Sequence, residues 1–75
     1  MNAAELRRWI GVQPFRPFRI RMTDGVALDV RHPEEVVPFK TTAWVARGPN
    51  GEVSERHLTI ALLHVIRLEP IEDAG

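Results

Sequence analysis

The sequence predicts a mainly β protein with one N-terminal helix, folded as a small five-stranded antiparallel barrel. Apolar and polar residues alternate with period two over residues 18–22 and again over 26–30, on either side of a Thr-Asp-Gly turn, which is typical of a half-buried hairpin. Helical periodicity is confined to residues 2–11. We therefore expect one small barrel domain over residues 1–71, followed by an acidic tail at 72–75.

Composition limits the functions that the chain can perform. It has 75 residues, ten basic side chains balanced by ten acidic ones, and no cysteine, so disulfides and thiolate metal sites are excluded. A neutral chain does not bind nucleic acid through overall charge alone. No apolar run approaches the roughly 20 residues of a membrane span, and we expect a soluble cytoplasmic protein. Because so short a chain has a small core, self-association is a natural supplement to its stability.

The N-terminal helix is predicted by a cap and an apolar stripe. Asn2 can accept from the free N–H groups, and Glu5 stands three residues later, as in a capping box. The apolar side chains share one side of this helix: Leu6, Trp9 and Ile10. Pro14 and Pro17 then favour an extended connector that leads into the first strand.

The hairpin register follows from which residues must share a face. A two-residue Asp-Gly loop would set Ile20 opposite Asp29 and mix apolar with charged side chains. A three-residue loop instead sets Ile20 opposite Leu28 and Arg19 opposite Asp29. We therefore predict the three-residue loop, with Gly25 in the left-handed conformation.

The Arg-rich stretch QPFRPFRIR has two interpretations. In the first, the arginines are solvated and structural, because Arg19 pairs across the strands with Asp29 and Arg21 lies diagonal to it. In the second, Arg16, Arg19 and Arg21 contact a single-stranded nucleic acid whose bases stack on Phe15.

The remaining elements are short and bounded by turn residues. In order, we expect a turn at 33–35, a strand at 42–47, a type I turn at 48–51, a strand at 53–60, a helical corner at 61–64 and a last strand at 65–71. Leu58 and Ile60 should face inward from the strand at 53–60. The strand at 42–47 is apolar on both faces, which predicts that the helix or a partner chain covers its second face. Trp44 on this strand belongs either to the core or to a flat contact surface, since its neighbours Thr42 and Ala46 are small.

The helix, the IRMTDGVALDV hairpin and the LLHVIRLEP segment together resemble the Sm-like fold, a kind of SH3-like barrel, and in particular the family of the bacterial Sm-like RNA chaperone Hfq. This resemblance implies RNA binding at a basic corner. Only His64 matches that corner, because Leu62 and Leu63 stand where the family has an aromatic residue and a lysine. The chain is also similar to small uncharacterised bacterial proteins with a PFRPFR…TDG run, a likeness that implies no activity.

Candidates for catalysis or metal binding are few. Ser54 is the only serine and falls within a predicted strand. His32, His57 and His64 lack the spacing of a zinc site, and the adjacent carboxylates of Glu34 and Glu35 are typical of a solvated turn. We therefore expect no enzyme activity, no cofactor, no metal site and no small-molecule substrate.

Two functions fit these observations. One is a small self-associating interaction or structural module that joins copies of the chain through exposed strand edges. The alternative is an Sm-like RNA-binding protein that uses the Arg-rich hairpin and the His64 corner. The candidate contact residues for RNA or a partner are Phe15, Arg16, Arg19, Arg21, Trp44, His64 and Arg67.

Overall fold

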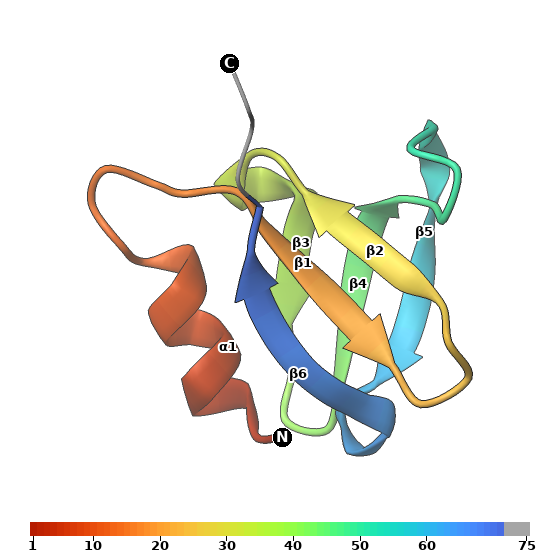
Figure 1. The fold of residues 1–75 in the computed structure, drawn as a ribbon, viewed down its shortest axis with the longest axis horizontal. Coiled ribbons are helices and arrows are strands. Elements are labelled where there is room, and N and C mark those ends of the chain that lie inside the picture. The colour runs from red at the N-terminus through yellow and green to blue at the C-terminus, as the bar shows by residue number, and fades with distance from the viewer. Residues whose placement is uncertain (72–75) are drawn as a thin grey trace.

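The computed structural model describes residues 1–71, apart from the side chains of residues 54–56. The predicted acidic tail at 72–75 lies outside the described residues. The elements, in order, are α1 (Ala3–Ile10), β1 (Phe18–Met22), β2 (Ala27–Val30), the 3₁₀ turn η1 (Pro33–Glu35), β3 (Val36–Pro38), β4 (Thr42–Arg47), β5 (Val53–Ala61), the 3₁₀ turn η2 (Leu62–His64) and β6 (Val65–Pro70). The prediction of a mainly β protein with one N-terminal helix is confirmed (Figure 1).

The strands form two three-stranded sheets, in the orders β2-β1-β6 and β3-β4-β5. This differs from the predicted barrel in two ways, because the described chain has six strands instead of five and its sheets do not close on each other. The strand missing from the prediction is β3, which is only three residues long and ends in a proline. So short a strand carries no period-two pattern, since alternation needs about four residues to be recognised.

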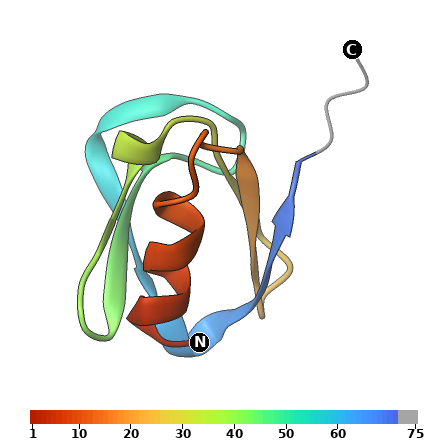
Figure 2. The same ribbon diagram turned by 90° about the vertical axis from the view of Figure 1, so that its left-hand side faces the viewer.

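Helix α1 begins and ends where its sequence predicts. Asn2 Oδ1 accepts the backbone N–H of Glu5 at 2.9 Å, and the N–H of Gly11 closes the last turn on the Arg7 carbonyl. Leu6 is buried, and the Trp9 ring lies 5.5 Å from the ring of Phe18, centroid to centroid. Figure 2 shows that α1 covers the opening between β3 and β6, so one of the two open sides of the sandwich is closed by the chain itself.

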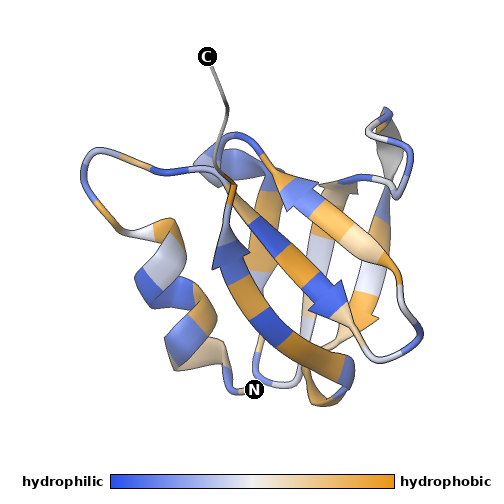
Figure 3. Cartoon of the chain, in the orientation of Figure 1, coloured by the Kyte–Doolittle hydropathy of each residue, from blue (hydrophilic) through white to orange (hydrophobic). Residues whose placement is uncertain are grey.

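The predicted hairpin register is confirmed. Ile20 lies opposite Leu28 and Arg19 opposite Asp29, and Gly25 has a φ of +89° in the three-residue loop. Figure 3 shows the resulting alternation of hydrophobic and hydrophilic residues along β1. The inner face of this sheet packs on Ala43 of β4, which is also fully buried.

We expect replacement of Gly25 by valine to lower the free energy of unfolding by on the order of 1 kcal/mol or more, because a β-branched residue resists a positive φ. Nothing lies within 4 Å of an added Cβ at this position, so the loss reports backbone conformation and not a clash. Urea denaturation measures the change. Thr23→Val is the matched control, since it places a valine in the same loop at a position where φ is negative. A G25V variant as stable as T23V would contradict the left-handed loop.

A buried ion pair joins two distant turns. Glu35 Oε1 accepts the backbone N–H of Arg31 at 2.8 Å and that of His32 at 3.3 Å. Its other oxygen accepts Arg47 Nη2 at 2.7 Å, while Arg47 Nη1 donates to the carbonyl of Gly51 at 2.9 Å. The turn after β2 is thereby fixed to the turn between β4 and β5.

The environment of Glu35 corrects the predicted solvated turn. Burial raises the pKa of its carboxyl, but the hydrogen bonds from Arg47 and from two backbone N–H groups outweigh burial and hold the pKa below its ordinary value of 4.5. Its side chain is only 10% exposed, whereas neighbouring Glu34 is exposed. The prediction therefore holds for Glu34 and is wrong for Glu35.

Candidate functional site

The second open side of the sandwich contains a groove between the outer strands β2 and β5. Its cavity volume is about 540 Å³. It is lined by hairpin residues, by the end of β5, by His64 of the η2 corner and by Pro49; the hairpin residues are Met22, Thr23, Asp24, Val26 and Leu28. Helix α1 closes the opposite side, and within the described residues no element covers this one. The groove is therefore the place where the interior of the fold meets solvent.

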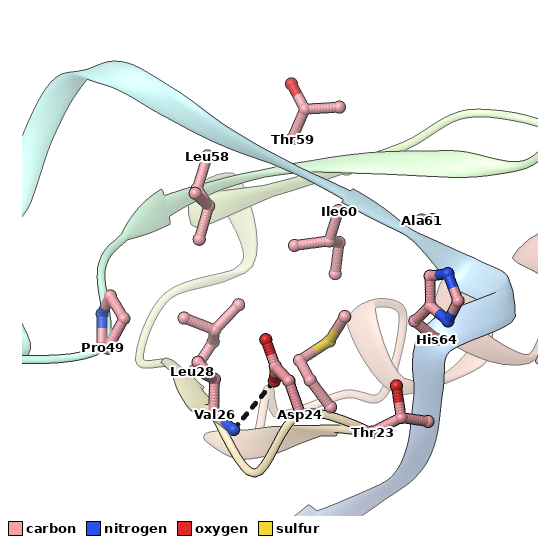
Figure 4. Close-up of a pocket in the computed structure, with 11 residues that line it drawn as sticks. Thr23, Asp24, Val26, Leu28, Pro49, Leu58, Thr59, Ile60, Ala61 and His64 are labelled. Atoms are coloured by element: carbon pink, nitrogen blue, oxygen red, sulfur yellow. Dashed lines mark hydrogen bonds between the residues drawn. The ribbon is translucent and has the colours of Figure 1, made fainter.

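Alternating sequence creates the apolar floor of this groove. Figure 4 shows Leu58 and Ile60 directed from β5 towards Val26 and Leu28 of the hairpin, while Thr59 is directed away. Leu58 lies opposite the buried Val45 in the strand register, yet its side chain remains 40% exposed. The sequence correctly predicts that Leu58 faces inward, and the structure adds that nothing in the described chain covers it.

Polar groups stand at one end of the groove, and Pro49 stands at the other (Figure 4). Asp24 Oδ1 accepts the backbone N–H of Val26 at 3.0 Å, which fixes its carboxylate at the hairpin tip. The N–H of Thr23 donates to the carbonyl of His64 at 2.9 Å and ties this tip to the η2 corner. His64, predicted from sequence as a contact residue, therefore borders the groove with its side chain exposed.

Strand β5 supplies the backbone for an interaction. It pairs with β4 along one edge, and within the described chain no strand pairs with its other edge. The N–H and C=O groups directed to that edge are free to bond an added strand. The edge runs along the apolar floor, so one extended segment can contact both.

The outer face of the same sheet carries an aromatic cluster, defined by Phe39, Trp44 and His57. The rings of Phe39 and Trp44 meet edge to face with centroids 5.0 Å apart, and the His57 ring lies 5.6 Å from Trp44. Trp44 is 44% exposed, which rules out its assignment to the core and leaves the contact-surface interpretation. The helix contacts β3 and leaves Trp44 exposed, so it does not cover this face of β4, and cover by a partner chain stays a prediction.

The outer face of the other sheet is charged but largely neutralised. Arg19 Nε donates to Asp29 at 2.8 Å, as predicted. Arg21 lies diagonal to Asp29 in the strand register, also as predicted, and bonds Glu69 of β6 at 2.9 Å. Arg67 joins the same Glu69 carboxylate at 3.0 Å.

These pairs also shift the acidity of the carboxyls. The hydrogen bond from Arg19 lowers the pKa of Asp29, and those from Arg67 and Arg21 lower the pKa of Glu69. The three predicted arginines of this face therefore already bond carboxylates of the chain itself.

The predicted contact residues do not gather at one site. Arg19, Arg21 and Arg67 share the charged outer face, while Trp44 lies on the opposite sheet and His64 borders the groove. The other two belong to the connector after α1. Phe15 is half-buried with its ring 6.1 Å from that of Phe18, and Arg16 is exposed.

Two residues of the aromatic cluster, His57 and Phe39, were not predicted from sequence as contact residues. His57 and Thr59 alternate with the inward residues of β5, so the strand register alone could have placed His57 on the face of Trp44. Phe39 follows β3, the strand that sequence did not reveal, and its N–H bonds the Thr42 carbonyl at 2.8 Å. No local sequence pattern predicts that this turn places the Phe39 ring against Trp44.

Candidates for other chemistry are sparse in the part of the chain that the structure describes. No group of three or more His, Asp or Glu side chains is placed there to hold a metal ion. The side chain of Ser54 lies outside the described residues. The one α-helix of that part has eight residues, and no helix in it has the length and apolar character needed to traverse a bilayer.

No family model, curated protein or solved structure matches the chain.

Proposed function

We propose that the protein is a small interaction module that self-associates through the open side of its sandwich, with the free edge of β5 and the groove as the contact. The observation that supports this most directly is the exposure of Leu58, an inward-facing core residue next to an unpaired strand edge. A monomer would leave both the apolar floor and the edge to water, and edges of this kind readily accept another strand.

Addition of a strand to β5 would cover the apolar floor of the groove and pair the free strand edge at once. A strand paired with β5 uses the free backbone groups, and its alternate side chains enter the groove against Leu58 and Ile60. Its other side chains then continue the outer face beside His57 and Trp44. The added strand would also narrow the gap between β5 and β2, which is the closure expected of the SH3-like or Sm-like barrel inferred from sequence.

A second copy of the chain is the partner that we favour. Two β5 edges can pair antiparallel about a two-fold axis, so that each strand gives and receives the same contact. The apolar residues of the second strand then lie on the same face as Leu58 and Ile60 of the first. Such a contact adds apolar burial to a 75-residue chain whose own core is small.

RNA binding at the Arg-rich hairpin stays a prediction, with less support. The arginines of that face bond Asp29 and Glu69, so binding phosphates would require these pairs to separate or leave the carboxylates facing the polyanion.

A pair of leucine variants tests self-association. We expect Leu58→Lys to shift the mass measured by light scattering towards the 8.5 kDa of one chain, because a charged side chain in the groove opposes docking. Leu63→Lys is the matched control, since Leu63 is 80% exposed and lies outside the groove lining.

Wild-type protein and the L63K variant should both exceed the mass of one chain at the same concentration. Circular dichroism melting would verify that both variants are folded. A monomeric wild type would refute the proposal, and equal dissociation of the two variants would refute the groove as its site.

A further inference from the structure

A second groove lies on the other side of the molecule, where the end of α1 meets the connector and the end of β6. Its cavity volume is about 370 Å³, at the lower end of the volumes that hold ligands. Five residues line it: Arg8, Trp9, Val12, Arg16 and Pro70. We propose that this groove binds acidic peptide segments that carry an apolar side chain, independently of the contact at β5.

Unpaired arginines supply the charge for this site. Four arginines of the strands, Arg19, Arg21, Arg47 and Arg67, each bond a carboxylate of the chain. Arg8 and Arg16 have no such partner among the described residues, and both are exposed. Two guanidinium groups from different elements therefore face one groove without a carboxylate partner among the described residues, which favours an anionic occupant.

The wall between these arginines is apolar. Val12 is 42% exposed, and Trp9 and Pro70 complete the lining. The Trp9 ring is held in place by its contact with Phe18, so this wall is preformed. Burying Val12 and the accessible part of Trp9 under an apolar side chain would add to the attraction of the charges.

The same features favour a peptide over a nucleic acid. Base stacking needs an open aromatic face, but Trp9 and Phe15 are both half-buried against Phe18, and the rest of the wall is aliphatic. Two free arginines match one or two carboxylates better than a chain of phosphates.

Fluorescence anisotropy with labelled probes tests this site. The supporting probe is the peptide Glu-Leu-Glu-Leu-Glu with blocked termini, and the comparators are its Lys-Leu-Lys-Leu-Lys counterpart and a thymidine decamer. We expect saturable binding of the acidic peptide, weakened about tenfold or more in the double variant Arg8→Gln with Arg16→Gln, because charge-assisted bonds are lost. The matched control is Arg7→Gln, a helix arginine that does not line the groove, which should bind as wild type does.

Three results would overturn the proposal. The first is equal binding of the acidic and basic peptides. The second is a loss of affinity for the acidic peptide in the R7Q variant as large as that in the double variant. The third is tighter binding of the thymidine decamer than of the acidic peptide. Chemical-shift changes of the Trp9 indole N–H on peptide addition would locate the contact. The L58K variant should bind the peptide as wild type does, so failure here and failure of self-association remain distinguishable.

Discussion

Replacing Phe18 by alanine should lower the free energy of unfolding by about 3–5 kcal/mol, because it removes a fully buried aromatic ring and leaves a cavity. Phe18 is the first residue of β1 and lies between Val30 and Pro70 in the sheet. The rings of Trp9 and Phe15 both pack against it, so the truncation also weakens the packing of α1 and the connector on the sandwich. In a domain this small such a loss is a large part of total stability.

The control for the F18A variant is F39A, which truncates an exposed phenylalanine of the aromatic cluster. Phe39→Ala should cost much less, about 1 kcal/mol, because no buried cavity forms. Urea denaturation followed by tryptophan fluorescence compares the two variants. Equal losses would show that Phe18 is not the aromatic centre of the core.

Replacing Glu35 by glutamine should cost about 3 kcal/mol at neutral pH. Breaking a buried ion pair from one side typically costs 3–5 kcal/mol, and the 21% exposure of the Arg47 side chain places this pair at the lower end of that range. The Nε of Arg47 is already buried with no hydrogen-bond partner, so loss of the carboxylate leaves its charge poorly compensated. Glu34→Gln, at the exposed neighbouring position, should be nearly neutral.

The difference in stability between wild type and the E35Q variant should depend on pH in a defined direction. The folded protein holds the pKa of Glu35 below its ordinary value of 4.5, so the carboxylate contributes stability above that pH and loses it as the pH falls through the folded pKa. Wild type and the E35Q variant should therefore converge in stability in acid. Urea midpoints measured from neutral to acid pH test this, and a gap that stays constant would contradict the ion-pair account.

The parts of the fold that sequence predicts well are those determined by neighbouring residues. The hairpin register follows from alternation and one turn, and the helix from its Asn2 cap and apolar stripe. The corner at η2 and the turn at 48–51 likewise need only neighbouring residues, and the Gly51 N–H bonds the Gly48 carbonyl as in a β-turn.

The parts that sequence missed depend on contacts between distant residues. Glu35 is buried because Arg47, twelve residues away, reaches it across two turns. A capping box at the turn after β2 was the one local signal, since Glu35 stands three residues after His32 and accepts its backbone N–H. Alternation likewise assigns Leu58 to the inner face but cannot say whether another layer covers it.

The free edge of β5 is the centre of the proposed function, and amide hydrogen exchange at low and at high micromolar concentration tests it most directly. If a second chain pairs with this edge, exchange over residues 57–61 should slow as concentration rises, while exchange over β3, the opposite edge of the same sheet, should not change. Exchange over residues 57–61 that is equally fast at both concentrations, in a range where mass measurements report association, would contradict pairing through β5.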